Sequence, residues 1–416
     1  MRKHTDKSYI YCTPYLDEIR RIRDDCGRSR FKEPLPYESS KIDDFNKLLA
    51  SGADIAVTHA TLLNATDETI NRIQEGEYTL ILDETIDVIQ EYNDLSSVRE
   101  LHQSLNETNI KCILLEKGFI HIGDDNKVTW IERTHDDSFQ FSEVERLATL
   151  GRMYCISEKC MLAVLPQDIF KAFKSVYVLT YQFAGSILQH YFDFFNLEYE
   201  ISLDIEADKL FREKCTRLIT LYCGGNNKRN YLSSSWYDGA SKKDIIAVKR
   251  KLENYYGNIL RRTGYKVSDA MWTCPKKRKD DLSGKGYTRR DLTKDERKLP
   301  KLEQELIKQK AFRFVPCNAR ATNDYRERWA LAYCCNMHYN PMIKRFFTDG
   351  NEKRKRAGLP AIEPNDDRLA LSFLIQWVCR SRIRDDGEIH LYIASKRMYD
   401  LFTDWMNGRT LQSGAS

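Results

Sequence analysis

The chain has 416 residues, of which 42% are hydrophobic and 11% aromatic, a composition that supports two or three packed domains and excludes a disordered chain. No run of about 18 apolar residues occurs, and the first residues include no apolar stretch, so we expect neither a membrane span nor a secretory signal. The twelve cysteines form no Cys-x-x-Cys pair, which argues against a zinc ribbon and favours reduced thiols in a cytoplasmic protein.

The formal net charge of +5 hides a difference between the two halves of the chain. Residues 1–200 carry 22 basic and 34 acidic side chains, and residues 201–416 carry 44 and 27, so the two nets are −12 and +17. This asymmetry predicts a first domain over residues 1–200 and a basic second domain over 201–416 that faces a polyanion. The alternative is that the charge is merely solvated.

Continuously apolar runs in the first half predict strands that are buried on both faces of a parallel sheet. Helical patterns at 16–22, 42–49 and 184–195 alternate with them, as in a doubly wound α/β fold, where ligands bind beyond the carboxyl ends of the strands. The predicted strands are 8–12, 54–58, 79–83 and 176–180. The polar residues that end these strands would then line one edge of the sheet, and they are Thr13, Thr58, Asp83, Glu84 and Thr180.

Residues from about 91 to 170 interrupt this alternation, and we interpret them as an insertion between two strands of the sheet. Short strands are predicted at 110–115, 118–122 and 127–131, followed by a helix at 141–151. The insertion gives no indication of its function.

The second half again alternates strands and helices, so it also predicts an α/β domain. The predicted strands are 217–222, 311–315 and 388–394, and the predicted helices are 243–263, 325–336, 368–382 and 396–406. Residues 271–300 are polar and are predicted to form a loop.

The clearest local signal is Asp83-Glu84 at the end of an apolar strand. A carboxylate at this point can hold Mg²⁺, which prefers few protein carboxylates together with phosphate oxygens. A second carboxylate can orient and deprotonate an attacking water. The alternative is a pair of ordinary carboxylates at a strand–loop boundary.

A second signal is the stretch that contains Gln376, Arg380 and Arg384. The two arginines are four residues apart, so in a helix they share a face, and paired guanidinium groups suit phosphate oxygens. The alternative is a basic helix end that stabilises its own dipole.

Together these segments resemble the motor of a superfamily 2 (DExx-type) helicase or translocase of the kind found among bacteriophage replication genes. The order of the segments along the chain agrees with that family. Residues 11–15 resemble motif Ia, 55–62 motif Ib, 83–86 motif II, 178–183 motif III, 317–324 motif V and 376–384 motif VI.

The resemblance implies two RecA-like domains of the P-loop NTPase type, with ATP and Mg²⁺ bound between them and DNA preferred to RNA as the partner. It implies that Asp83 holds Mg²⁺, that Glu84 activates water, that Arg380 and Arg384 contact the γ-phosphate, and that Gln376 senses the nucleotide. The residues that would contact nucleic acid are Thr13, Pro14, Tyr15, Thr58, His59, Thr180, Asn318 and Thr322. No metal other than Mg²⁺ is expected, and a phage-encoded protein would act in the bacterial host cytoplasm.

Two departures from the family affect these expectations. Ile383 stands where motif VI usually has its second arginine, and no Gly-x-x-x-x-Gly-Lys-[Ser/Thr] occurs in the chain. We therefore expect a first domain that is truncated at its N-terminus, with weak or absent ATP hydrolysis. The alternatives are a non-catalytic nucleic-acid-binding remnant of the same fold and a terminase-type packaging ATPase.

Overall fold

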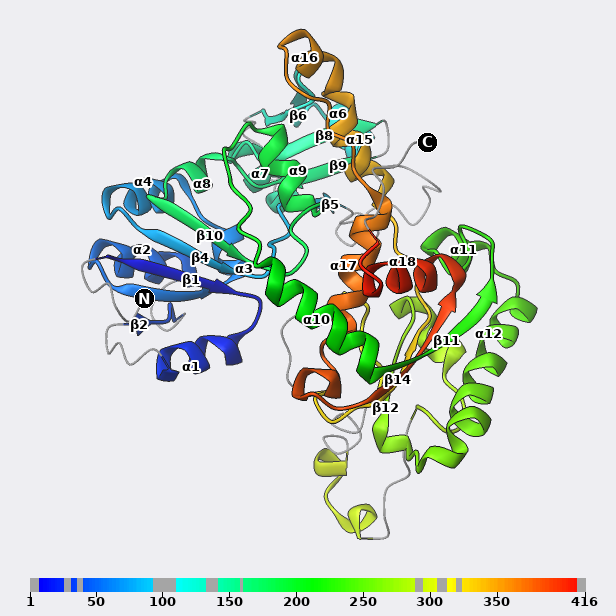
Figure 1. Ribbon diagram of the computed structural model, residues 1–416. Coiled ribbons are helices and arrows are strands. Elements are labelled where there is room, and N and C mark those ends of the chain that lie inside the picture. The colour runs from blue at the N-terminus through cyan, green and yellow to red at the C-terminus, as the bar shows by residue number, and fades with distance from the viewer. Residues whose placement is uncertain are drawn as a thin grey trace. The chain divides into compact units, whose positions relative to one another are not determined.

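The computed structural model describes residues 7–25, 31–35, 40–92, 110–131, 141–157, 160–288, 295–304, 313–318 and 324–409. The chain forms two compact units, each with its own parallel sheet (Figure 1). The first unit comprises Met1–Glu200 and Tyr339–Pro364, and the second comprises Ile201–His338 and Asn365–Ser416.

The segment Tyr339–Pro364 lies in the first unit, although the sequence placed it in the second domain. It contains helices α15 (Pro341–Asp349) and α16 (Asn351–Arg356). Ile343, Phe346 and Phe347 of α15 are buried in the core of the first unit. The apolar face of α15 therefore decides its unit, and neither composition nor charge reveals such a return of the chain.

The first unit is built around a five-stranded parallel sheet of order β10-β4-β1-β3-β2. Its strands are β1 (Tyr9–Thr13), β2 (Phe31–Lys32), β3 (Asp54–Thr58), β4 (Thr79–Asp83) and β10 (Ser175–Leu179). Its helices are α1 (Leu16–Asp25), α2 (Lys41–Ala50), α3 (His59–Leu63), α4 (Asp67–Glu75), α8 (Asp168–Lys171) and α9 (Ile187–Phe194). The four strands predicted from apolar runs are all present and parallel.

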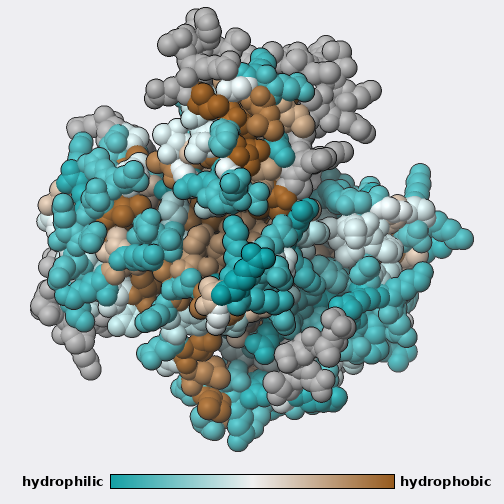
Figure 2. Space-filling model, turned by 90° about the horizontal axis from the view of Figure 1, so that it is seen from above, coloured by the Kyte–Doolittle hydropathy of each residue, from teal (hydrophilic) through white to brown (hydrophobic). Residues whose placement is uncertain are grey.

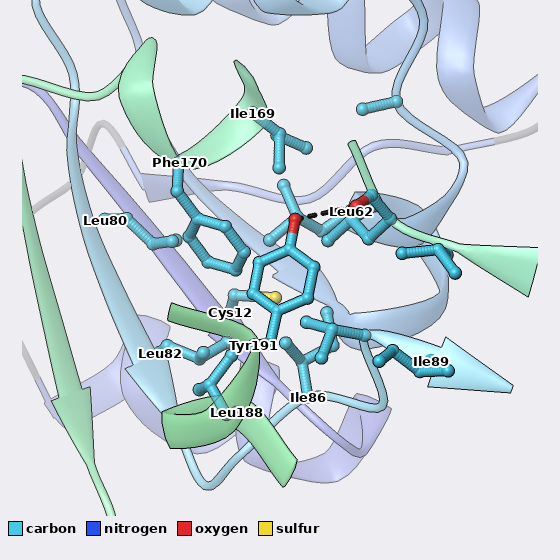
Figure 3. Packing of buried hydrophobic residues seen from close by; sticks show 14 of the residues in the cluster. Cys12, Leu62, Leu80, Leu82, Ile86, Ile89, Ile169, Phe170, Leu188 and Tyr191 are labelled. Atoms are coloured by element: carbon cyan, nitrogen blue, oxygen red, sulfur yellow. Dashed lines mark hydrogen bonds between the residues drawn. The ribbon is translucent and has the colours of Figure 1, made fainter. Parts of the chain in front are cut away.

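Helices cover both faces of this sheet. On one face the odd-numbered side chains of β1, Tyr9 and Tyr11, pack against Ile19 and Ile22 of α1. On the other face a larger core includes residues of α2, α4, α8 and α9. Figure 3 shows Tyr191 of α9 within that core, and its hydroxyl donates a hydrogen bond to the carbonyl of Leu165 at 2.6 Å.

Strand β10 departs from the prediction that each strand is buried on both faces. It is the edge strand, and the side chains of Tyr177 and Leu179 are 55% and 53% exposed. Val176 and Val178 point to the opposite face and pack against the core. Figure 2 shows hydrophobic residues in patches on a mostly hydrophilic face of the molecule.

The predicted insertion forms small antiparallel sheets. Strands β5 (Ile89–Tyr92), β9 (Cys160–Val164) and β8 (Met153–Ser157) pair in that order, and β6 (Ile120–Ile122) pairs with β7 (Val128–Trp130). Two helices, α6 (Ile110–Glu116) and α7 (Ser142–Thr149), accompany them. The predicted strand at 110–115 is wrong because Ile113 and Leu114 are buried while Leu115 is exposed, which is a helical rather than an alternating pattern.

The second unit contains a parallel sheet of order β11-β14-β13-β12. Its strands are β11 (Ile219–Asn226), β12 (Ala270–Thr273), β13 (Ala330–Tyr333) and β14 (Ile389–Ser395). Its α-helices are α10 (Ile205–Leu218), α11 (Ser234–Gly239), α12 (Lys242–Asn254), α13 (Lys279–Leu282), α17 (Asp366–Val378) and α18 (Lys396–Met406). Short π or 3-10 helices are η2 (Tyr255–Ile259), η3 (Leu260–Thr263), η4 (Val267–Asp269), η5 (Lys276–Arg278), η6 (Glu296–Lys298) and η7 (Arg382–Asp385).

The helices of the second unit lie on opposite faces of its sheet (Figure 1). Helix α12 packs on the face that carries Trp272 and Tyr392. On the other face, Tyr333 of β13 contacts Trp377 of α17 with the ring centroids 5.3 Å apart. Helix α18 packs against α17, β14 and β11 on that second face.

Several predicted elements of the second unit are wrong. The helix predicted at 325–336 contains strand β13, whose four residues are all buried in the middle of the sheet. Alanine and leucine favour helices intrinsically, but burial between two strands decides the structure here. Strand β12 lies partly in the predicted loop, and the predicted helix 243–263 ends as an α-helix at Asn254. Of the strand predicted at 311–315, Phe314 forms one bridge with Trp272, while residues 311–312 lie outside the described residues.

Candidate functional site

The carboxyl ends of four parallel strands meet at one edge of the first sheet. Thr13 of β1 pairs in register with Thr58 of β3, and Asp83 of β4 pairs with Leu179 of β10. Thr180 directly follows β10. Because neighbouring parallel strands end side by side, the polar residues that follow them are brought to the same edge, which is where ligands bind in open α/β sheets.

Asp83 is held by two hydroxyl groups of β1. The Thr13 hydroxyl donates to the Asp83 carboxylate at 3.4 Å, and the Tyr11 hydroxyl also donates to it. Burial raises the pKa of Asp83 above its ordinary value, whereas the hydrogen bond from Tyr11 acts in the opposite direction. The carboxylate is therefore half-buried and fixed in orientation.

Glu84 directs its carboxylate toward the other neighbouring strand. Its φ angle is +64°, which few residues other than glycine adopt. Its N–H donates to the carbonyl of Leu179 at 3.0 Å, and its carboxylate accepts a hydrogen bond from the Thr180 hydroxyl at 3.1 Å. The two adjacent acids thus bond to opposite neighbours of β4, and a strained backbone of this kind is common at functional sites.

Four further residues that were predicted to contact nucleic acid lie at the same edge. His59 begins α3, is 7% exposed, and its Nε2 lies 3.0 Å from the backbone oxygen of Asp83. Thr58 caps α3 by accepting a hydrogen bond from the N–H of Thr61 at 3.4 Å. Pro14 is half-buried and Tyr15 is exposed just beyond β1.

The residues predicted from motif VI lie near the amino edge of the second sheet, at the end of α17 and in the segment that leads to β14. Gln376 is half-buried within α17, Arg380 is 6% exposed in the turn after it, and Arg384 is exposed in η7. The expectation that the two arginines share a helix face is wrong, because α17 ends at Val378.

The structure describes Asn318 but not Thr322, the two residues predicted from motif V. Asn318 is exposed in a turn of the second unit. Thr322 lies outside the described residues.

Tyr11 of this edge was not predicted to be a site residue. The sequence placed it in an apolar run typical of a buried strand and at the start of the segment 11–15 that resembles motif Ia, without giving it a role. A signal was present, however, because Tyr11 lies two residues before Thr13 and therefore faces the same side of the sheet. Its register partner on β4 is Ile81, two residues before Asp83, so its hydroxyl can reach that carboxylate.

The acidic pair can serve as part of a magnesium site. Among the described residues no group of three or more His, Cys, Asp or Glu side chains is arranged to hold a metal ion. Mg²⁺ commonly takes only one or two protein carboxylates and completes its shell with water and phosphate oxygens. The half-buried, oriented carboxylate of Asp83 therefore fits Mg²⁺ and does not fit a structural metal enclosed by protein ligands.

The described helices include none that is both long and apolar enough to cross a bilayer.

Among solved structures, an XPD helicase matches with a TM-score of 0.52 at 12% identity, covering 97% of this chain and 90% of that chain. Xpd4 of S. tokodaii matches at 13% identity over 97% and 89% of the two chains, with a TM-score of 0.48 that is too low to support an argument. The XPD likeness is one of fold, and it confirms the predicted α/β, RecA-like class.

Two comparisons identify the family. A model described as the YonV C-terminal Rossmann-like domain matches residues 213–406. The SPbeta prophage-derived protein YonV of Bacillus subtilis (strain 168) is 32% identical over 428 residues, which cover 97% of this chain and 93% of YonV. Because the identity extends over nearly the whole of both chains, the protein belongs to the family of the prophage protein YonV.

Proposed function

We propose that the protein is a helicase-like motor that binds a nucleoside triphosphate at the edge of its first sheet and moves on nucleic acid, with DNA preferred to RNA. One observation carries the proposal. Asp83 and Glu84 stand at the carboxyl edge of a parallel sheet, each held by a hydroxyl from a neighbouring strand or its end, in a chain with the fold of a helicase. This is the position at which nucleotide hydrolysis needs two carboxylates.

Each acid has a distinct role in this proposal. Asp83 is the ligand for Mg²⁺, which supplies positive charge to the phosphate oxygens when bound. Tyr11 and Thr13 keep that carboxylate pointing in one direction. Glu84 orients the attacking water and accepts its proton, and Thr180 fixes the position of the Glu84 carboxylate.

The remaining predicted residues keep the roles that the resemblance gave them. Arg380 and Arg384 contact the phosphate groups, and Gln376 senses the nucleotide. The burial of Arg380 suits a residue that is held in one conformation, whereas the side chain of Arg384 is exposed. The nucleic-acid contacts that the resemblance assigned are likewise kept for each unit by itself: Thr13, Pro14, Tyr15, Thr58, His59 and Thr180 in the first unit, and Asn318 and Thr322 in the second.

The absence of Gly-x-x-x-x-Gly-Lys-[Ser/Thr] from these 416 residues favours a second candidate function. That loop normally supplies backbone N–H groups and a lysine to the β- and γ-phosphates. A chain without it binds triphosphate weakly and turns it over slowly. The second candidate is therefore a nucleic-acid-binding protein of the same fold that does not hydrolyse nucleotides.

An ATPase assay on the full chain separates the two candidates. Phosphate release is measured with Mg²⁺ in the presence of single-stranded DNA, single-stranded RNA or neither. The motor predicts turnover that the strand stimulates and that Glu84→Gln lowers by about 100-fold or more, because a general base is removed. Asp87→Asn, an exposed acid three residues away, is the matched control. Strand binding without turnover, or turnover that is unchanged in Glu84→Gln, contradicts the motor.

A further inference from the structure

The second sheet has one point at which neighbouring strands send the chain to opposite faces. Strand β11 lies beside β14. After β11 the chain continues to α12 on the face that carries Trp272, and after β14 it continues to α18 on the face that carries Trp377. In open α/β sheets this arrangement leaves a crevice beyond the carboxyl ends of the two strands, and ligands bind there.

A cavity of about 450 Å³ lies at this point. Asn227 and Arg229, which follow β11, form one wall, and the first turn of α18 with Lys396 and Arg397 forms another. The volume falls within the roughly 300–1,000 Å³ of small-molecule sites. All lining residues belong to the second unit, so the cavity is a property of that unit by itself.

Two glycines bring the end of β11 close to β14. A Cβ atom on Gly224 would lie 2.1 Å from the carbonyl oxygen of Ala394, so only glycine fits there. Gly225 has a φ of +73°, which also favours glycine. The carbonyl of Gly224 accepts a hydrogen bond from the Lys251 ammonium group at 3.0 Å. The loop that carries Asn227 therefore leaves β11 in a defined direction across the crevice.

The carboxylates around the cavity already have cationic partners. Three carboxylates line the cavity: Asp367 accepts a hydrogen bond from Arg397 at 2.6 Å, Asp400 pairs with Lys396, and Asp404 pairs with Arg409, which does not line the cavity, at 3.0 Å. In the described part of the chain, by contrast, no carboxylate pairs with exposed Arg229. The loop after β11 therefore brings positive charge to the cavity that the nearby acids do not neutralise.

Arg229 and Arg397 also act on the nearby side chain of His338. Its pKa is lowered first by burial and then by Arg397, Asp366 raises it, and the smaller effects of Arg229 and Asp367 lower and raise it respectively. The start of α18 also lacks its usual acceptor, because the hydroxyl of the N-cap residue Ser395 makes no capping hydrogen bond. Backbone N–H groups at a helix start, together with the unneutralised charge of Arg229, favour an anion.

We propose that this crevice binds a phosphate group through Arg229, Asn227 and the first turn of α18. The phosphate belongs either to a free nucleotide or to the backbone of a nucleic-acid strand, and the proposal relies on the proposed function only for that strand. Both sources offer the same chemistry to the site, namely an oxygen-bearing anion that accepts hydrogen bonds. Arg397 and Lys396 are paired with Asp367 and Asp400, so the uncompensated positive charge of the crevice comes from Arg229.

Binding measurements on the full chain test the proposal without any need for hydrolysis. Inorganic pyrophosphate is titrated by calorimetry, and a fluorescein-labelled oligothymidylate is titrated by fluorescence anisotropy at several salt concentrations. The variants are Arg229→Ala and Arg229→Gln, which retains most of the side chain. The control is Arg250→Ala, an exposed arginine on α12 that does not line the cavity.

The proposal predicts that both Arg229 variants weaken one or both probes by about tenfold, because a charge-assisted hydrogen bond is lost. A loss for the oligonucleotide, with a salt slope smaller by about 0.7, assigns the phosphate to a strand. A loss for pyrophosphate alone assigns it to a free nucleotide. Failure of the wild type to bind either probe, or Arg229 variants that match Arg250→Ala, would overturn the proposal. These binding measurements do not depend on ATP hydrolysis. A negative ATPase assay would therefore contradict the proposed motor without affecting the test of the phosphate site.

Discussion

The two parallel sheets end in different chemistry at the edges where their ligands are expected. The first sheet presents Asp83 and Glu84, held by hydroxyl groups of neighbouring strands. The second presents Arg229, Lys396 and Arg397 around a cavity. Lys396 and Arg397 are paired with acids of the same lining, whereas no described carboxylate pairs with Arg229. The same architecture thus offers an acidic edge in one unit and, in the other, a crevice of mixed charge that contains an unneutralised arginine. The comparison teaches that the strand order fixes where a site forms, whereas the residues after each strand fix what it binds.

The largest expected effect on stability comes from comparing a buried strand of the first sheet, β4, with its exposed edge strand, β10. Leu80 is fully buried in β4, so Leu80→Ala is expected to lower the free energy of unfolding by about 3 kcal/mol. Leu179 on the neighbouring edge strand is 53% exposed, so Leu179→Ala should cost less than about 1 kcal/mol. Urea denaturation of both variants measures the difference. Equal losses would mean that the exposed face of β10 is covered in solution.

The next effect tests the close approach in the second sheet. Gly224→Ala places a Cβ against the carbonyl oxygen of Ala394 and is expected to lower the free energy of unfolding by about 2 kcal/mol. Gly257→Ala is the control, because nothing lies within 4 Å of its added Cβ. In the helical turn η2 that change should be neutral or stabilising by up to about 1 kcal/mol. Equal changes in thermal stability in Gly224→Ala and Gly257→Ala would argue against the tight junction of β11 and β14.

A smaller effect on stability is expected from removing the hydrogen bond between Tyr11 and Asp83 at the acidic edge. Tyr11→Phe removes a hydrogen bond that lowers the pKa of Asp83, so the pKa of Asp83 should rise further. The charged carboxylate is then less well stabilised in the folded protein, so the free energy of unfolding at neutral pH should fall by about 1 kcal/mol. The pKa of Asp83 is raised in the folded state, so its stabilising contribution exists at low pH and is lost as the pH rises through that pKa. The deficit of Tyr11→Phe should therefore shrink on acidification toward about pH 4.

Denaturation at neutral and acidic pH measures this deficit, and the Asp83→Asn background provides the control. In that background the effect of Tyr11→Phe should not depend on pH, because the titrating partner has been removed. A deficit with the same pH dependence in both backgrounds would show that Tyr11 acts through packing alone.

The sequence predicted much of the first sheet and its edge. Continuous apolar runs identified β1, β3, β4 and β10, and the polar residues after them included Asp83 and Glu84. These predictions succeed because burial on both faces leaves a direct mark on the sequence. Tyr11 was missed because its polar atom becomes relevant only when β1 lies beside β4.

Other features could not be predicted because they depend on long-range packing. Strand β13 contains residues that favour helices, and only its place between β12 and β14 makes it a strand. The arginines at 380 and 384 were assigned to one helix face, but helix α17 ends before either of them. The crevice at Arg229 depends on the pairing of β11 with β14, which are separated by more than a hundred residues.

The central claim is that the acidic edge of the first sheet binds nucleotide together with Mg²⁺. Calorimetric titration of ATP into the full chain, with and without Mg²⁺, tests it most directly when wild type, Asp83→Asn and the exposed control Asp87→Asn are compared. Mg²⁺ should strengthen ATP binding in the wild type and in Asp87→Asn, and Asp83→Asn should remove this strengthening. Binding of equal affinity in all three proteins, unchanged by Mg²⁺, would contradict it.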